Sequence, residues 1–203
     1  MSIIQMPTGL YISSAEFKNH RYEITESSDA TGTSASRIFG PPKWGLSIAC
    51  DNVATPDQSA EWEVLALGLE GELNRLAAYD PRRREPRGTM RGTITLGAPV
   101  AKYDKVIQLA GASGTLLPGD MLQVGVGVGT SMLFKIMAPV TGSGAATASV
   151  FPASRYAFTA GTTVIWDHPR MYCKLLNKEV SWQYEANTTT MGNHRLELLE
   201  AFN

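Results

Sequence analysis

The chain has 203 residues, of which 43% are hydrophobic and 18% are charged. This balance is typical of a globular protein with one large domain or two small ones, and it excludes the disordered and fibrous classes. The formal net charge of -1 gives no overall attraction to nucleic acid or to a membrane surface. The first residues lack the basic start and apolar stretch of a signal peptide, and no segment approaches the ~18 apolar residues of a membrane helix. We therefore expect no membrane insertion, and a protein that is made and kept in the cytosol or leaves it only as part of a larger particle.

The N-terminal part predicts two half-buried strands. Residues 43–51 place Trp44, Leu46 and Ile48 on one face, in strict alternation with smaller or polar residues. Residues 21–26 alternate in the same way, which predicts a second strand. The stretch 27–36 between them is rich in Ser, Thr, Gly and Ala, and this composition predicts an exposed loop.

One helix is predicted over residues 56–70. Thr55 is a candidate N-cap, Pro56 suits the first helical position, and Gln58 completes a capping box. An apolar stripe follows at three- and four-residue spacing, formed by Trp62, Leu65 and Leu69. Gly71 is placed to end the helix, and residues 73–79 are expected to be extended.

The composition changes at Asp80, where the segment 80–88 carries two prolines and four arginines and predicts a linker. Short strands separated by glycine turns follow. They are expected at 92–96, 105–109, 121–124, 132–137, 146–151 and 161–166. Turns or loops are expected at 117–120, 125–129 and 142–144. Five or six short strands in about 75 residues predict a small antiparallel barrel.

Longer strands return at 171–176, 179–185 and 195–201, and Asn177-Lys178 is a candidate hairpin turn between the first two. We therefore predict a mainly β fold. Residues 1–87 and 168–203 would form one β-sandwich-like domain with a single helix, and residues 88–167 would form an inserted small barrel. Cys50 and Cys173 lie in apolar, strand-like runs, which predicts buried reduced thiols. A disulfide would require their strands to lie side by side.

The densest charged feature is a group of five arginines within ten residues: Arg82, Arg83, Arg84, Arg87 and Arg91. Such a group can contact nucleic-acid phosphates, or it can face a partner protein or solvent as part of a connector. No aromatic residues alternate with these arginines, so stacking on single-stranded bases is not supported.

Motifs for catalysis or cofactor binding are not found. His20, His168 and His194 each lack a neighbouring ligand at metal-binding spacing. The glycines of 125–129 precede a predicted strand, whereas a phosphate-binding loop needs a helix at that point. No G-x-S-x-G is present, and neither cysteine has a local histidine partner. We expect a non-enzymatic protein with no catalytic residue, cofactor or metal.

The order of elements resembles the distal tail proteins of long-tailed bacteriophages. The resemblance rests on 44–48, the helix through Trp62, the Arg/Pro linker and the closing strand at 179–182. Its most specific part is 114–124, with Leu-Pro-Gly-Asp at 117–120, followed by 133–136 and 148–152.

This resemblance implies a ring domain interrupted by an oligosaccharide/oligonucleotide-binding (OB)-like barrel. It implies a homohexameric ring in the virion tail tip that joins the tail tube protein to the baseplate hub and to fibre or receptor-binding proteins. In such a ring the arginine-rich linker could face the lumen, where it would contact DNA transiently, or the outside, and the sequence leaves both orientations open. It implies no catalytic residue. Two alternatives stay open: a carbohydrate-binding or adhesion module, and another tail structural protein such as a tube, terminator or adaptor subunit. A hydrolytic enzyme would require a cluster of carboxylates or histidines that the sequence does not show.

Overall fold

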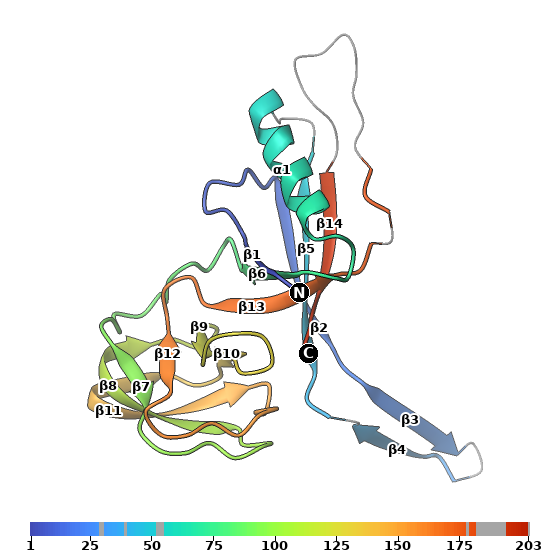
Figure 1. The fold of residues 1–203 in the computed structure, drawn as a ribbon. Helices are drawn as coiled ribbons and strands as arrows, with labels where there is room; N and C mark the ends of the chain where they lie inside the picture. The colour runs from blue at the N-terminus through green and yellow to red at the C-terminus, as the bar shows by residue number, and fades with distance from the viewer. Residues whose placement is uncertain (29–30, 39, 52–54, 178, 182–193, 203) are drawn as a thin grey trace.

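A computed structural model describes residues 1–28, 31–38, 40–51, 55–177, 179–181 and 194–202. These residues form fourteen strands and one helix, so the predicted mainly β fold is confirmed. The strands are arranged in a six-stranded sheet, a closed barrel and a separate two-stranded hairpin (Figure 1).

The six-stranded sheet has the order β1-β6-β13-β14-β5-β2. Its strands are β1 (Ile3–Gln5), β2 (Ser14–His20), β5 (Lys43–Cys50), β6 (Arg75–Tyr79), β13 (Arg170–Leu175) and β14 (His194–Glu200). β1 and β6 are parallel, and the other neighbours are antiparallel. β5 is a strand, as predicted, but the prediction that it is half-buried was wrong. All residues from Trp44 to Cys50 are buried, because β5 is an inner strand whose two faces are both covered. β1 and β2 are the two edges of the sheet.

Helix α1 (Pro56–Gly68) packs on this sheet, as Figure 1 shows. The predicted capping box is present: the Thr55 hydroxyl accepts the backbone N–H of Gln58, and the Gln58 side chain accepts that of Thr55. Trp62, Leu65 and Leu69 are buried against the sheet, as the apolar stripe predicted. The helix ends at Gly68, three residues before the expected glycine, because the chain turns back at Glu70 and Gly71 with positive φ to enter β6.

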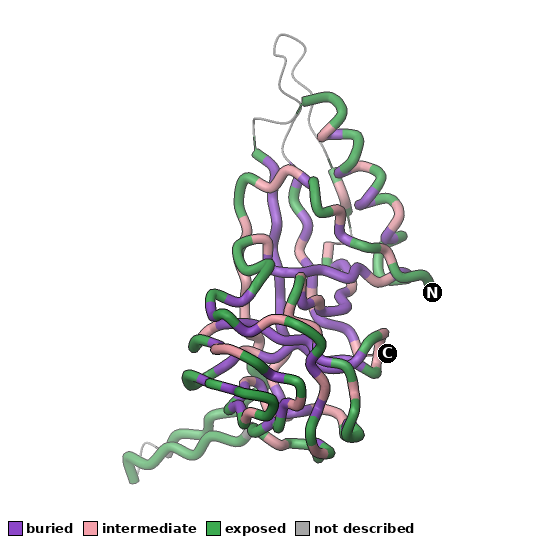
Figure 2. Tube along the Cα trace, turned by 90° about the vertical axis from the view of Figure 1, so that its left-hand side faces the viewer, coloured by how far each residue is buried: buried purple, intermediate pink, exposed green. Residues whose placement is uncertain are grey.

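The hairpin consists of β3 (Glu23–Ser28) and β4 (Thr33–Ile38), which pair only with each other in the described residues. The prediction of a loop over 27–36 was therefore wrong. Exposed strands that pair through their backbones need no apolar alternation, so their sequence can look like a loop. The hairpin leaves the body of the protein, and Figure 2 shows residues 23–27 and 33–37 of it as exposed.

The barrel closes in the order β10-β11-β8-β7-β12-β9. Its strands are β7 (Ile94–Leu96), β8 (Val106–Leu116), β9 (Met121–Val124), β10 (Met132–Ile136), β11 (Val140–Phe151) and β12 (Thr163–Ile165). The predicted antiparallel barrel is confirmed, with six strands where an OB-fold has five. Residues 125–129 connect the paired strands β9 and β10, as predicted. The predicted loop at 142–144 was wrong, because Gly142 and Gly144 lie inside β11 and pair with β8 next to a bulge.

The barrel strands lie between Ile94 and Ile165, and the sheet strands lie before Tyr79 and after Arg170. The two units share one packed junction. Met121 and Leu133 of the barrel belong to the same buried cluster as Trp44 and Leu46 of the sheet. The barrel therefore packs against the sheet instead of hanging from the linker alone.

The predicted hairpin between 171–176 and 179–185 is not formed in the described residues. The two neighbours of β13 are β6 and β14, and residues 179–181 are not in a strand. Lys178 and residues 182–185 lie outside the described residues. Cys50 and Cys173 are free and buried, as predicted. Cys50 pairs with His194 and Cys173 pairs with Glu200, at opposite ends of β14, so the two thiols do not meet.

Candidate functional site

The arginine-rich connector is held mainly by contacts within the protein. Arg83 donates to the carbonyl of Gly119 at 2.6 Å, and Arg87 donates to the carbonyl of Pro118. Arg82 pairs with the buried carboxylate of Asp80, with 3.2 Å between Nε and Oδ1. The guanidinium of Arg84 lies 6.0 Å from the centre of the Tyr79 ring.

Arg91 has a different set of partners from the other four. It pairs with Glu85 at 3.3 Å, and its guanidinium lies 5.0 Å from the centre of the Trp166 ring. The structure therefore brings four of the five predicted arginines into contact with the barrel or with connector carboxylates. These contacts fix the connector to the barrel.

Asp120 explains why the Leu-Pro-Gly-Asp turn precedes β9. Its carboxylate is buried and accepts the backbone N–H groups of Leu117 at 2.7 Å, Arg87 at 3.0 Å and Gly88 at 3.3 Å. The Nε of Arg87 lies 3.5 Å from the same carboxylate. One side chain thus closes the turn and anchors the end of the connector to the barrel.

A second buried carboxylate, that of Glu200, lies where the sheet meets the barrel. It accepts the backbone N–H of Trp44 at 3.0 Å. Burial raises the pKa of Glu200 to about 7, although the Trp44 N–H and the charges of Arg155 and Lys43 act in the opposite direction. Burial also lowers the pKa of Lys43. Two residues further on, Phe202 lies under the Arg155 guanidinium, 3.9 Å from the ring centre.

A third polar group is buried under α1. Ser59 and His194 are hydrogen bonded at 2.8 Å, and the Ser59 hydroxyl also lies 3.3 Å from a Glu63 oxygen. The His194 ring stacks on Trp62 with 5.9 Å between centres. A catalytic triad needs the carboxylate on the histidine and an accessible hydroxyl. Here the carboxylate is on the serine, and Ser59 and His194 are both buried. The arrangement therefore fixes the helix to β14.

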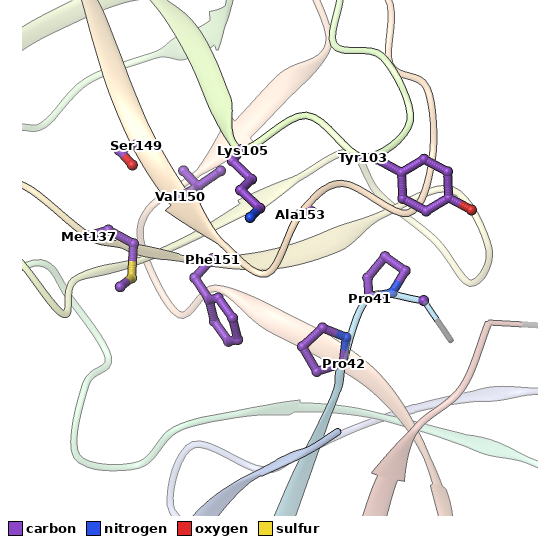
Figure 3. A pocket seen from close by; sticks show the side chains of 10 residues that line it. Pro41, Pro42, Tyr103, Lys105, Met137, Ser149, Val150, Phe151 and Ala153 are labelled. Carbon is purple, nitrogen blue, oxygen red and sulfur yellow. The ribbon is translucent and has the colours of Figure 1, made fainter. Parts of the chain in front are cut away.

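A cavity of about 700 Å³ lies between the barrel and the base of the hairpin. Figure 3 shows its walls: Pro41 and Pro42 precede β5, Tyr103 and Lys105 precede β8, and Met137 and Phe151 come from the barrel. A smaller hollow shares Gly40, Pro42 and Phe151 with it. Cavities of this size are typical of sites for small molecules.

Sequence reasoning missed this cavity, because its walls come from separate stretches of the chain: 40–42, 103–105 and 137–153. No single one of these segments carries a recognisable motif. Glu200 was detectable in principle, because it continues the alternation of the buried residues Leu196 and Leu198 along β14. A carboxylate on the apolar face of a strand is the kind of signal that marks an unusual buried acid.

Within the described residues, no group of three or more His, Cys, Asp or Glu side chains is arranged to hold a metal ion. The one helix in this part of the chain is too short to cross a membrane. No family model matches the chain, and no curated protein matches it in sequence.

Proposed function

We propose that this protein is a structural subunit of a bacteriophage tail tip. In this proposal, six copies form a ring that joins the tail tube protein to the baseplate hub and to the fibre or receptor-binding apparatus. The observation that carries the proposal is the β3–β4 hairpin, which projects from the body and is exposed at residues 23–27 and 33–37 (Figure 2). A two-stranded hairpin is marginally stable in water by itself. A neighbouring subunit is the natural surface against which it would be ordered.

Exposed apolar side chains on the hairpin and on α1 support this reading. Tyr22 is 44% exposed and Ile24 is 55% exposed. On α1, Val64 is 72% exposed and Leu67 is 60% exposed. Val64 also lines a shallow hollow together with Ile4 and Pro7 of the N-terminal segment. Contiguous apolar surface on a soluble protein often marks an interaction site. The hairpin and this helix face are the two surfaces that we assign to contacts between subunits.

The geometry of these surfaces favours a ring over a two-fold dimer. The hairpin and the α1 face are different surfaces at different ends of the sheet (Figure 1). A contact between two unlike surfaces is heterologous, and repeated heterologous contacts close into a ring when the rotation allows it. The formal net charge of -1 also permits close packing of identical copies.

The carbohydrate-binding alternative receives less support from the described surface. A sugar platform needs several exposed aromatic rings on one face. In the described part of the barrel, Tyr103 is the one large aromatic residue with more than a third of its surface exposed. The indole N–H of Trp166 donates to the Gly92 carbonyl at 2.7 Å, and Arg91 covers its ring.

Negative-stain imaging of the purified protein tests the proposal. We expect particles with sixfold symmetry and an open centre. Uniform particles of the size of one chain, at concentrations where the protein is stable and folded, would contradict the ring. Binding of such single chains to isolated glycans would favour the adhesion module instead.

A further inference from the structure

The cavity between the barrel and the hairpin base combines an apolar wall with one positive charge. The wall is formed by Pro41, Pro42, Tyr103 and Phe151, with Met137 at the rim. Among the described residues that line it, Lys105 is the one with a charged side chain, and Figure 3 shows its ammonium group pointing toward Phe151 and the prolines. Lys105 forms no salt bridge in the described part of the chain.

The charges around the cavity are mostly positive. The ammonium of Lys102 lies 5.2 Å from the centre of the Tyr103 ring. Arg155 donates to the carbonyls of Pro41 and Pro42. The adjoining hollow is lined by Arg21 and Glu23, so it adds one charge of each sign. The nearby carboxylate of Asp104 accepts the backbone N–H of Ala101 at 2.7 Å, which is a hydrogen bond within its own turn.

The backbone of Tyr103 supports the reading of a built site. Tyr103 has a φ of 74°, which is uncommon for a residue other than glycine. Its N–H donates to the Ser154 carbonyl at 2.6 Å, and its ring is 57% exposed at the mouth of the cavity. Residues in such conformations cost free energy and cluster at ligand sites. The strain holds an aromatic ring where it covers the cavity instead of packing in the core.

We propose that this cavity binds a small organic anion with an apolar body, such as a carboxylate on an aliphatic or aromatic frame. The apolar part would lie against Phe151 and the prolines, which removes apolar surface from water. The anionic group would pair with Lys105, whose ammonium group forms no ion pair with a carboxylate among the described residues. A neutral ligand leaves this ammonium without a counter-charge near an apolar wall, and a cationic ligand is repelled by it. The inference goes beyond the ring-forming function and does not depend on it.

Isothermal titration calorimetry with decanoate and decanol tests the proposal, because the two ligands share a chain and differ in charge. Both are used below the concentrations at which they aggregate. We expect decanoate to bind at least ten-fold more tightly than decanol. Lys105→Gln should weaken decanoate binding about ten-fold and leave decanol binding within two-fold of the original protein. Lys105 is exposed, so this variant should fold normally, and its thermal midpoint checks that.

Lys18→Gln is the matched control. Lys18 is a surface lysine on β2, it is not part of the cavity wall, and it pairs with Glu16 at 2.9 Å. It should leave both affinities unchanged. Met137→Asp is a second test: Met137 is 52% exposed at the rim, so a carboxylate there should weaken decanoate binding without unfolding the chain.

The proposal is overturned if decanoate and decanol bind equally, if neither binds, or if Lys18→Gln weakens decanoate binding as much as Lys105→Gln does. Co-sedimentation with phosphatidylglycerol vesicles distinguishes a free anion from the same charge on a membrane. Vesicle binding that depends on Lys105, in the absence of decanoate binding, would also overturn a pocket for a free ligand. The oligomeric mass of each variant is measured in parallel, so that failure of the ring and failure of the ligand site are told apart.

Discussion

The indole N–H of Trp44 donates to the main-chain carbonyl of Leu133 at 2.9 Å, and this contact joins the six-stranded sheet to the barrel. The same tryptophan lies edge-on to Phe151 of the barrel, with 5.9 Å between ring centres. Its backbone N–H is held by Glu200. Because one buried side chain binds both units, we expect the sheet and the barrel to unfold together.

Trp44→Phe should keep an aromatic ring in the junction and remove this hydrogen bond. The expected loss in the free energy of unfolding is about 1–3 kcal/mol, the cost of leaving a buried polar group without its partner. Urea unfolding followed by circular dichroism measures it. Trp166→Phe is the control. The hydrogen bond of the Trp166 indole lies at an exposed site, so its removal should lower the free energy of unfolding by less. An unchanged stability for Trp44→Phe would contradict the role of the junction.

Asp120→Asn should destabilise the turn that anchors the connector. The Asp120 carboxylate now accepts hydrogen bonds from the backbone N–H groups of Leu117, Arg87 and Gly88. Asparagine would replace one of the accepting oxygens with an NH₂ group, which cannot accept them. We expect a loss of about 2–3 kcal/mol, since these bonds are buried and involve a charged acceptor. Asp167→Asn is the matched control, because the side chain of Asp167 is 57% exposed. Equal thermal midpoints for the two variants would refute this account of the Leu-Pro-Gly-Asp turn.

Because the pKa of Glu200 is raised in the folded protein, we expect the free energy of unfolding to fall as the pH rises toward neutrality. Burial raises the pKa of its carboxyl from 4.5 to about 7 in the folded chain, so the folded state binds the proton more tightly than the unfolded state. The resulting stabilisation is fully present below pH 4.5 and is lost as the pH rises through about 7. The linkage relation gives an effect of about 3 kcal/mol over this window. The groups that face Glu200 are Lys43, Arg155, Tyr156 and Cys173.

Glu200→Gln isolates this effect, because glutamine is neutral and can still accept the Trp44 N–H. Burial lowers the pKa of His194, so that residue works in the opposite direction below pH 6.5. The difference between the original protein and the variant removes the contribution of His194. We expect the variant to gain relative stability from pH 4.5 to pH 8, as measured by urea unfolding at each pH. A difference that does not change with pH would contradict the raised pKa.

Ile24→Asp should separate assembly from folding. The side chain of Ile24 is 55% exposed on the hairpin, so a charge there should change the thermal midpoint of the single chain little. In the ring, the same charge would be buried against the neighbouring subunit. We therefore expect the variant to need at least a ten-fold higher protein concentration to form rings. Glu26→Gln, at an exposed position of the same strand, is the control. Rings formed by Ile24→Asp at the original concentration would exclude the hairpin from the contact.

The elements that sequence reasoning predicted correctly are those with local signals. α1 begins with a capping box and carries an apolar stripe, and both can be read from consecutive residues. β5 alternates large and small residues over its whole length. In each case, the chain segment itself contains the pattern that decides its structure.

The elements that were missed lack such a pattern. The first four residues of β4 and the middle of β11 are Ser, Thr, Gly and Ala, and each segment is a strand because a partner strand pairs with its backbone. The prediction of a hairpin after β13 was wrong for a related reason. The partner of β13 is the distant strand β14, in the place where residues 179–185 were expected to pair. The arginines were visible in the sequence, but their partners at Gly119 and Asp120 lie more than 30 residues further on. Pairing between distant segments is not encoded in any local window.

The mass of the purified protein in solution tests the central claim most directly. Light scattering should give six times the 22.0 kDa of one chain, and Ile24→Asp should give the mass of a single chain. A mass of one chain for the original protein, across micromolar concentrations and with a native thermal midpoint, would contradict the ring-forming subunit that we propose.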